Sequence, residues 1–283
     1  MQIVIASGKG GTGKTTVSSN LGYVLSHSRT ITLADCDVEE PNLGIFFPCV
    51  PEIHHVHVII PHVLESRCMH CGACGEFCRF GALTVLKDRV LFFPQLCHSC
   101  GGCFRVCPHD ALEENPAYVG EVQTCHLSDS LTLVSGKLKE GDVRTTAVIR
   151  RVRGMIEHDA LVLLDSPPGT ACPFIETVDK VTLCVLVTEP TPFGLHDLSV
   201  AVNVLEVLNI PAAVVINRSE GSDEHIEEYC ISRGLPVLMK IPLDFDLLRA
   251  QNNGDLISRT DPAWFDRFKE LGEHILAYAG GVL

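Results

Sequence analysis

The sequence has no long apolar run, and this lack excludes one class of protein. A membrane-spanning helix needs roughly 20 consecutive apolar residues, and no stretch of the 283 residues approaches that length. The first strand is expected within the first few residues, which leaves no room for a cleaved signal sequence before it. We therefore expect a cytoplasmic protein. A chain of this length allows either one large α/β domain with an insertion or two domains.

Basic residues are also scarce. The chain has 22 Lys and Arg residues against 35 Asp and Glu residues, for a formal net charge of −13. Such a surface repels nucleic acid and anionic lipid unless its basic residues cluster, and the sequence contains no dense Lys/Arg block. We therefore expect no nucleic-acid partner and no membrane partner.

Cysteine, in contrast, is abundant. The chain has 14 cysteines, and eight of them fall between residues 68 and 107. Thiols in the cytoplasm stay reduced, so this number points to metal or redox chemistry rather than to a disulfide framework.

A glycine-rich loop between an apolar strand and a helical pattern is the first strong motif. Residues 2–5 are typical of a buried strand, and apolar residues recur at helical spacing over 17–25. The loop between them matches G-x-x-x-x-G-K-T, whose backbone N–H groups bind phosphate while Lys14 reaches the β- and γ-phosphates and Thr15 holds Mg²⁺. The predicted site for a nucleoside triphosphate consists of Gly8, Lys9, Gly10, Gly11, Thr12, Gly13, Lys14, Thr15 and Thr16.

Acidic residues follow two predicted buried strands. Asp35 and Asp37 come at the end of a strand over 30–35, where open α/β sheets bind their ligands. They either cap the strand or serve the nucleotide, and beside a phosphate loop we favour the second role, for Asp37 above Asp35. Asp165 ends the apolar strand 160–164, as in a Walker B motif, and the following Pro-Pro-Gly turn can approach the γ-phosphate. We predict that Lys14, Asp37 and Asp165 serve hydrolysis and that Thr15, Asp37 and Asp165 hold Mg²⁺; a role for Lys9 in hydrolysis is implied only by the family resemblance described below.

The pattern C-x₂-C-x₂-C-x₃-C occurs twice, about 29 residues apart, which is a repeat of the ferredoxin type. Three closely spaced thiolates bind three corners of a cubane, and the fourth cysteine is expected to start a helix directed toward the other cluster. One [4Fe–4S] cluster is therefore assigned to Cys68, Cys71, Cys74 and Cys107, and the other to Cys97, Cys100, Cys103 and Cys78.

Zinc is the alternative ligand of paired C-x₂-C motifs. Zinc sites rarely place four cysteines within eleven residues twice over, so we favour iron–sulfur clusters. Arg79 stands where ferredoxins usually carry proline, but proline is not a ligand. Between the two motifs, residues 83–86 and 89–92 are typical of a hairpin.

Strands and helices alternate along the rest of the chain, with strands expected over 119–124, 131–134, 181–187, 212–216 and 237–241 and helices over 143–158, 195–208, 223–233 and 262–279. This order predicts an α/β fold with a mainly parallel, doubly wound sheet and an inserted α+β domain. Residues 48–66 are expected to be a linker with a short strand. The predicted domains are 1–50 and 119–283 for nucleotide binding and 51–118 for the insertion.

These motifs together resemble the deviant-Walker-A ATPases of the MinD/ParA/Mrp class, and most closely a subgroup with an inserted two-cluster ferredoxin domain. The resemblance implies a P-loop NTPase fold and a homodimer that encloses ATP, in which Lys9 reaches the phosphates of the partner subunit. It also implies that Asp37 assists hydrolysis, that Asp165 lies near Mg²⁺ and that Asn217 contacts adenine. The strand ends that frame the base would supply Asn217, Arg218, Pro242 and Asp244.

Two features of known relatives are missing. A C-terminal C-x-x-C, which Mrp-type carriers use for a cluster shared between subunits, is not found, nor is the basic amphipathic tail of MinD. Two functions remain open: an ATPase that couples dimer closure to handling or assembly of a metal cluster, and an ATP-gated electron carrier resembling the nitrogenase iron protein. Both imply an iron–sulfur or redox client, and a ParA-like positioning role is disfavoured by the acidic charge.

Overall fold

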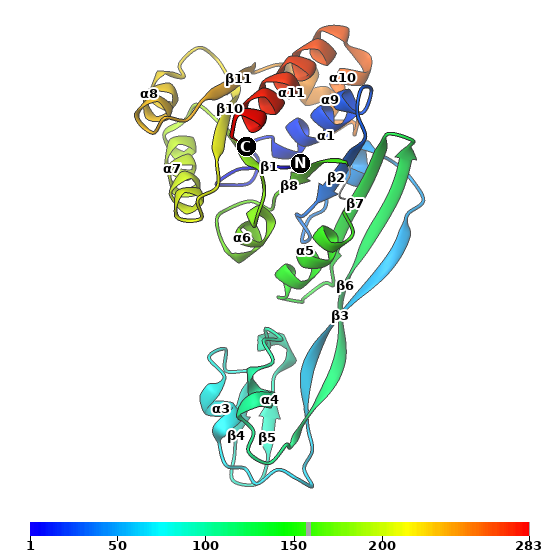
Figure 1. The fold of residues 1–283 in the computed structure, drawn as a ribbon, viewed down its shortest axis with the longest axis vertical. Coiled ribbons are helices and arrows are strands. Elements are labelled where there is room, and N and C mark those ends of the chain that lie inside the picture. The colour runs from blue at the N-terminus through cyan, green and yellow to red at the C-terminus, as the bar shows by residue number, and fades with distance from the viewer. Residues whose placement is uncertain (157–159, 283) are drawn as a thin grey trace.

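The centre of the molecule is a nine-stranded sheet in the order β11-β10-β9-β1-β8-β2-β7-β6-β3 (Figure 1). The computed structural model describes residues 1–156 and 160–282. All neighbouring strands from β11 to β7 pair in parallel, whereas β6 and β3 are antiparallel to their neighbours. The strands are β1 (Gln2–Ala6), β2 (Ile31–Asp35), β3 (Glu52–Val63), β6 (Leu112–Ser128), β7 (Leu131–Leu138), β8 (Leu161–Asp165), β9 (Leu183–Thr188), β10 (Ala212–Ser219) and β11 (Val237–Pro242).

Helices cover both faces of the sheet. One face carries α1 (Lys14–Leu25), α9 (Phe245–Asn252), α10 (Ile257–Thr260) and α11 (Pro262–Val282); the other carries α5 (Thr145–Gly154), α6 (Cys172–Val178), α7 (Pro192–Val207) and α8 (Glu224–Ser232). Successive side chains of a strand point to opposite faces, so Ile3 and Ile5 of β1 enter one core while Val4 and Ala6 enter the other. The predicted α/β fold with a mainly parallel, doubly wound sheet is confirmed.

The helix expected over 262–279 is α11, which buries an apolar stripe of Trp264, Phe268, Leu271 and Ile275. The helix expected over 143–158 is α5, and the last two residues of that prediction lie outside the described residues. None of the described helices is long and apolar enough to cross a membrane.

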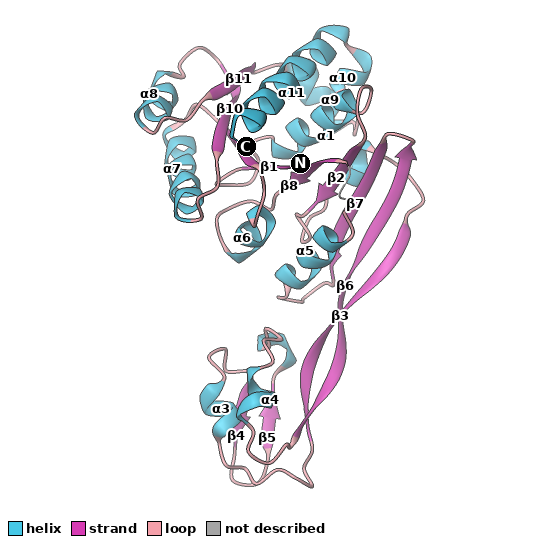
Figure 2. Cartoon of the chain, viewed as in Figure 1, coloured by secondary structure: helices cyan, strands magenta, loops and turns pink. Residues whose placement is uncertain are grey.

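The segment expected to be a linker with a short strand is instead half of a long β-ribbon. Strand β3 pairs along its whole length with β6, whereas β6 pairs with β7 only from Gly120 onward. Residues 112–119 of β6 therefore pair with β3 alone and continue beyond the end of β7 (Figure 2). Because β7 is parallel to β2 and β8, this is the edge where the parallel strands end, and the ribbon projects from it.

The ribbon leaves the sheet at a close approach of two backbones. A Cβ on Gly120 would collide with the carbonyl oxygen of Lys137 and contact Val148 of α5, so only glycine fits there. A bulge beside it, where β3 passes from Val56 to His57, shifts the register of the ribbon and adds local twist.

At its far end the ribbon carries residues 64–111, which we name the cysteine lobe (Figure 1). This lobe contains α3 (Ala73–Phe77), a hairpin of β4 (Leu83–Val85) and β5 (Val90–Phe92), a 3₁₀ turn η1 (Pro94–Leu96) and α4 (Gly102–Val106). The predicted hairpin is confirmed. The expectation that the fourth cysteine starts a helix is wrong, because α3 ends just before Cys78 and α4 ends just before Cys107.

One disulfide joins Cys49, just before β3, to Cys125 of β6. Our preference for metal or redox chemistry over disulfides does not extend to this pair. The bridge ties the start of the ribbon to the sheet, beside the short helix α2 (Leu43–Phe46) that follows β2.

Candidate nucleotide site and cysteine cavities

The glycine-rich loop joins β1 to α1 in the expected geometry. Gly11 and Gly13 have φ angles of 80° and 92°, which favour glycine, and α1 begins directly at Lys14. No side chain among the described residues caps the first turn of α1, so its N–H groups remain available to an anion. Asn217 holds the loop from outside by donating from Nδ2 to the carbonyl oxygen of Thr12 at 2.8 Å.

A cavity of about 350 Å³ lies at this loop. Its lining brings together Lys14, Thr15, Asp37 and Pro168, which come from three separate segments of the chain. Three side-chain carboxamides that were not predicted from the sequence also line the cavity. They belong to Asn42, Gln251 and Asn252. The carboxamides of α9 carry no recognisable motif, and only the packing of α9 against α1, where Thr16 donates to Gln251 at 2.7 Å, places them at the cavity.

Two of the predicted acidic residues lie close to the phosphate loop: Asp37 lines the cavity, whereas Asp165 contacts the start of α1 and does not line it. Asp165 accepts hydrogen bonds from Thr15 at 2.7 Å and from Ser18 at 2.8 Å, so Thr15 and Asp165 already lie together as a Mg²⁺ site requires. Burial raises the pKa of Asp165, although Lys14 and these hydroxyls oppose the rise. Burial also raises the pKa of Asp37 to about 6, against the opposing charge of Lys14.

Asp35 has a different position from Asp37. Its buried carboxylate accepts hydrogen bonds from the backbone N–H groups of Asp37 at 3.1 Å and Leu43 at 2.9 Å. Burial, followed by the charge of Asp165, raises the pKa of Asp35 well above its usual value. These contacts give Asp35 the role of shaping the loop that presents Asp37, which was the capping alternative.

Lys9 and Arg218 share one acceptor. The Lys9 ammonium lies 3.4 Å from Glu189, and Arg218 forms an ion pair with the other oxygen of the same carboxylate. Glu189 is buried, while Lys9 and Arg218 are partly exposed. Neither of these two basic residues lines the 350 Å³ cavity.

The other residues predicted to frame the base are engaged in local structure. Asp244 caps α9 by accepting from the N–H groups of Asp246 and Leu247 at 2.7 and 3.0 Å. Pro242 ends β11, and neither it nor Asp244 or Asn217 lines the cavity. The contacts of these residues with a base stay a prediction.

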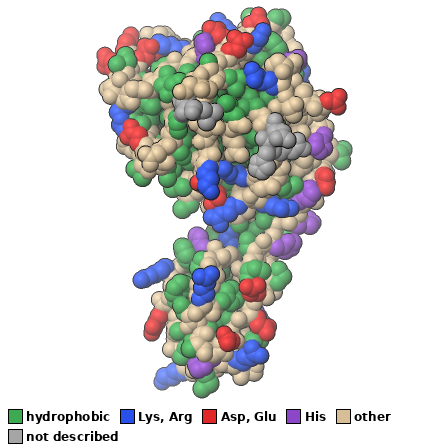
Figure 3. Space-filling model, viewed as in Figure 1, with side chains coloured by type: hydrophobic (Ala, Val, Ile, Leu, Met, Phe, Trp, Pro, Cys, Tyr) green, Lys and Arg blue, Asp and Glu red, His purple; other side chains and the backbone are tan. Residues whose placement is uncertain are grey.

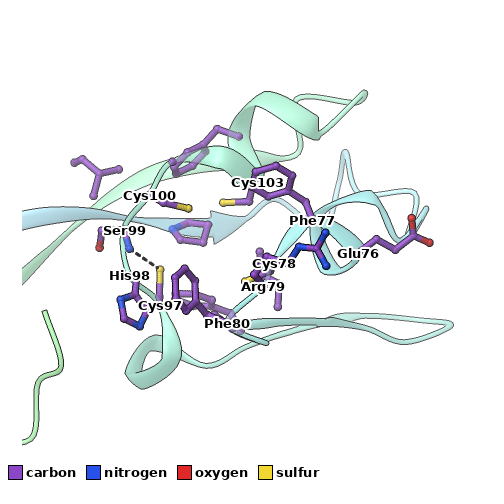
Figure 4. A pocket seen from close by; sticks show the side chains of 17 residues that line it. Glu76, Phe77, Cys78, Arg79, Phe80, Cys97, His98, Ser99, Cys100 and Cys103 are labelled. Atoms are coloured by element: carbon purple, nitrogen blue, oxygen red, sulfur yellow. Dashed lines mark hydrogen bonds between the residues drawn. The ribbon is translucent and has the colours of Figure 1, made fainter. Parts of the chain in front are cut away.

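The cysteine lobe contains two cavities lined by cysteines. The larger, of about 310 Å³, is lined by Cys78, Cys97, Cys100 and Cys103 (Figure 4). The smaller, of about 20 Å³, is lined by Cys68, Cys71, Cys74 and Cys107. Each cavity thus collects three cysteines from one repeat and the fourth from the other, which is the grouping assigned above. That these sets bind clusters stays a prediction.

Burial is the main influence on the ionisation of two of these cysteines. Burial raises the pKa of the Cys103 thiol to about 11, with the negative charges of Cys97 and Cys100 adding to the rise. Burial likewise raises the pKa of Cys74, helped by the charges of Cys107 and Cys68. A bound metal centre reverses this effect, because it stabilises thiolates directly.

Among the described residues, no three or more His, Cys, Asp or Glu side chains converge closely enough to hold a single metal ion. A tetrahedral zinc site needs its four sulfur atoms about 2.3 Å from one centre. A cubane binds each thiolate to a different iron, so its ligands stand around a cavity rather than at one point. The four sulfur-bearing side chains around the 310 Å³ cavity fit the second arrangement, as Figure 4 shows.

Comparison with known proteins places the chain in a family. A family model described as the CobQ/CobB/MinD/ParA nucleotide binding domain matches residues 3–257. The chain belongs to this family and is an ATPase of the MinD/ParA type.

Individual relatives are distant. The uncharacterized protein MJ0578 of Methanocaldococcus jannaschii is 29% identical over 279 residues, which cover 97% of this chain and 96% of the relative. An iron–sulfur cluster carrier protein of Pseudomonas fragi is 23% identical over 277 residues, covering 92% of this chain and 79% of the relative. The solved structure of the septum site-determining protein MinD with Mg-ADP from Pyrococcus horikoshii aligns over 100% of this chain and 98% of that chain, with a TM-score of 0.62 and 19% identity. The last comparison shows the fold alone.

Proposed function

We propose that this protein is an ATPase that couples nucleotide-dependent closure of a homodimer to the chemistry of two [4Fe–4S] clusters bound by the cysteine lobe. The observation that carries the proposal is that both cysteine sets lie on a ribbon formed by strands of the nucleotide-binding sheet. That ribbon projects from the edge at which the P-loop lies. The similarity to an iron–sulfur cluster carrier supports it.

In this proposal the chain's own residues carry out hydrolysis by positioning and charge neutralisation. Lys14 binds the β- and γ-phosphates, and Thr15 and Asp165 hold Mg²⁺. Asp37, at the wall of the same cavity, orients the attacking water. Lys9 leaves Glu189 and reaches the phosphates bound by the partner subunit, which makes closure depend on nucleotide.

When bound, a [4Fe–4S] cluster accepts and releases one electron. Around the larger cavity Cys97 and Cys103 are buried, Cys78 is half-buried and Cys100 is exposed, and Phe80 stacks on His98 with ring centroids 3.8 Å apart. In the smaller site the N–H of Ala111 donates to the Cys107 sulfur at 3.3 Å.

The exchange of one cysteine between the two sets favours a second candidate, an ATP-gated electron carrier. Ligands contributed by both repeats to each set would have to separate before a cluster could leave the lobe. A resident cluster suits electron delivery to a redox client, whereas assembly of a client's cofactor would need iron to move.

The test uses protein purified without oxygen, with iron and sulfide counted per chain. Electron paramagnetic resonance (EPR) spectra and sedimentation are then recorded with and without Mg²⁺ and a non-hydrolysable ATP analogue. We expect two clusters per chain, a dimer only with nucleotide, and a changed EPR signal in the dimer. The variant Lys14→Ala is the control and should show none of the nucleotide effects.

Iron that leaves for an apo-acceptor during turnover supports cofactor assembly, and iron that stays while the clusters are reoxidised supports electron transfer. Colourless protein with zinc on its eight thiols, or clusters indifferent to nucleotide, would refute the coupling.

A further inference from the structure

The disulfide between Cys49 and Cys125 lies where a thiol from solution can reach it. All the other cysteines among the described residues are free. Cys49 is exposed, whereas Cys125 is only 5% exposed. Both residues line a cavity of about 510 Å³ at the surface between α2 and the sheet. A thiol that enters this cavity therefore meets Cys49 first.

The segment 48–51, which joins α2 to β3, depends on this bond for its position. None of its residues forms a backbone hydrogen bond with any of the described residues. Pro48 and Pro51 lack an N–H group altogether, and Val50 is 96% exposed. The disulfide is therefore the main constraint on this segment.

Helix α2, which precedes this segment, separates the 510 Å³ cavity from the nucleotide site. Ile45 lines both this cavity and the nucleotide cavity, and its neighbour Phe46 lines the nucleotide cavity. Asn42, directly before the helix, lines the nucleotide cavity as well. The upstream end of the helix is fixed by Asp35, which accepts from the N–H of Leu43 at 2.9 Å. The disulfide holds the chain downstream of the same helix.

The bond also closes the base of the ribbon. It joins a residue just before β3 to β6, with a sequence separation of 76, so the whole cysteine lobe lies inside the closed loop. The ladder of β3 and β6 begins beside it, with Glu52 opposite Thr124. Figure 3 shows how narrow the molecule is between the nucleotide-binding part and the lobe. Breaking the bond would free the start of β3 together with residues 48–51.

We propose that the bond between Cys49 and Cys125 is a thiol–disulfide exchange site for a dithiol reductant, and that the intact bond raises the affinity of the adjacent site for Mg·ATP. The inference goes beyond the proposed function, because it needs the nucleotide site and not the clusters.

The exchange balances in electrons and protons. One thiolate of the dithiol attacks the sulfur of Cys49, and the bond to Cys125 breaks as a mixed disulfide forms on Cys49. Cys125 leaves as a thiolate and takes a proton. The second thiol of the reductant then attacks the mixed disulfide, which releases Cys49 as a thiol and converts the reductant to a disulfide. Two electrons and two protons have then passed to the protein.

The effect on nucleotide binding follows from order. With the bond intact, the wall formed by Asn42, Ile45 and Phe46 is already in place, whereas after reduction its downstream end must be ordered when nucleotide binds. Phe46 and Phe47 remain packed in the core, which limits the loss. We therefore expect a coupling of about fivefold, at the low end of the usual range.

The coupling is reciprocal, so nucleotide should make the bond harder to reduce by the same factor. For a two-electron couple, a fivefold change is about 20 mV.

The test uses the full chain, purified without oxygen and held in mixtures of reduced and oxidised dithiothreitol. Alkylation and mass spectrometry measure the state of Cys49 and Cys125 with and without the Mg²⁺ complex of a non-hydrolysable ATP analogue. Binding of that complex is measured for oxidised and reduced protein. Cys49→Ser lacks the bond, and Cys172→Ser, which removes an exposed free thiol, is the matched control.

We expect the reduced wild type to bind the complex about fivefold more weakly than the oxidised wild type, and reoxidation to restore binding. Cys49→Ser should bind like the reduced wild type in every mixture, and Cys172→Ser like the wild type. With nucleotide, half-reduction should need an about fivefold higher ratio of reduced to oxidised dithiothreitol. A monothiol should be trapped on Cys49 and leave Cys125 to be alkylated.

Equal nucleotide affinities of the oxidised and reduced wild type, or a response to dithiothreitol that persists in Cys49→Ser, would overturn the inference. A bond that survives excess reduced dithiothreitol in the native protein, or a mixed disulfide found on Cys125, would do the same. If Cys49→Ser does not fold, Cys125→Ala replaces it, and reduction and reoxidation of the wild type give the comparison without a variant. Clusters that ignore nucleotide would refute the proposed function and leave these results unchanged.

Discussion

The position of Glu189 bears on how Lys9 is held in the single chain. It is buried, and its carboxylate binds both Lys9 and Arg218. The lysine that the resemblance assigns to the partner's phosphates is therefore held by an acceptor of its own chain. Closure of the dimer would have to break this ion pair, so Glu189 sets part of the free energy of closure.

The substitution Glu189→Gln should make closure easier, because Lys9 then leaves a neutral group. A partly exposed ion pair contributes up to about 1 kcal/mol, so half-maximal dimerisation should need about fivefold less nucleotide. Sedimentation across an ATP-analogue series measures this. Glu220→Gln, an exposed neighbour, is the control. A higher nucleotide requirement would show that Glu189 supports the closed state instead.

Asp37 predicts a pH profile. Its pKa is about 6, so the carboxylate that we propose orients the attacking water becomes protonated as pH falls. We expect kcat/KM for ATP to be flat above this pKa and to fall about tenfold per pH unit below it. Asp37→Asn should reduce hydrolysis strongly and abolish the dependence. A profile unchanged in Asp37→Asn would assign the titration to another group.

The same residue predicts a stability effect of defined sign. Its folded pKa of about 6 lies above the ordinary value of 3.8, so between these values the folded protein binds more protons than the unfolded chain. Ionised Asp37 therefore opposes folding at pH 7. Asp37→Asn should raise the thermal midpoint of nucleotide-free protein at pH 7, with the gain vanishing toward pH 4. Glu273→Gln, at an exposed position of α11 that does not act on Asp37, should give no such gain, and equal gains in both variants would contradict the assignment.

Residue identities in the P-loop could be predicted because the motif, the strand and the helix are contiguous in sequence. Gln251 and Asn252 could not, since only the packing of α9 on α1 brings them to the cavity. Asn217 shows a different limit. The sequence places Asn217 near the carboxyl end of a predicted strand. It could not predict the hydrogen bond to Thr12, because the two residues are 205 positions apart in the chain.

Each cysteine set takes its fourth member from the other repeat, Cys78 from the end of α3 and Cys107 from the end of α4. This exchange predicts which cluster each cysteine substitution removes. Cys78→Ala should destroy the cluster of the other repeat and leave that of Cys68, Cys71 and Cys74 in place. Iron should fall from about eight to about four atoms per chain. Adding Cys97→Ala should cost nothing more, whereas adding Cys68→Ala should remove the remaining iron.

Anaerobic iron counts and EPR measure these losses, with the exposed, unpaired Cys172→Ser as a control. A Cys78→Ala protein that loses the cluster of its own repeat would contradict the exchange.

The bridge between Cys49 and Cys125 should stabilise the junction of ribbon and sheet. It closes a loop of 76 residues, and disulfides of this kind contribute about 2–4 kcal/mol. Dithiothreitol should therefore lower the unfolding midpoint of the wild type but leave that of Cys49→Ser unchanged. Equal changes of the unfolding midpoint in both proteins would show that the disulfide does not contribute to stability.

The ribbon is the element that the sequence concealed. Residues 48–66 were expected to be a linker with a short strand, whereas β3 extends through Pro61 and its partner β6 contains Pro116. Both prolines are tolerated because β3 is an edge strand and residues 112–119 of β6 have β3 as their one partner, so a missing N–H costs no sheet bond. The hairpin and the longer helices α1, α5, α7, α8 and α11, whose patterns are local, were predicted, whereas short helices such as α3, α4, α6 and α9 were not.

For the molecule as a whole, the parallel sheet positions every predicted nucleotide ligand at one edge, and the order of strands and helices was enough to anticipate it. The direction in which the inserted residues project could not be anticipated, because it depends on β6 running antiparallel to β7. That reversal directs the cysteine lobe past the nucleotide edge rather than away from it (Figure 1).

Any rotation of the ribbon about Gly120 would be amplified along residues 112–119, which pair with β3 alone. Eight extended residues span about 27 Å, and the pivot at Gly120 touches both Lys137 of β7 and Val148 of α5. A swing of about 10° at that pivot would carry the tip about 5 Å over such a span. Sub-ångström adjustments around a phosphate would thus reach a docked client as a displacement large enough to open or close the gap between two metal centres.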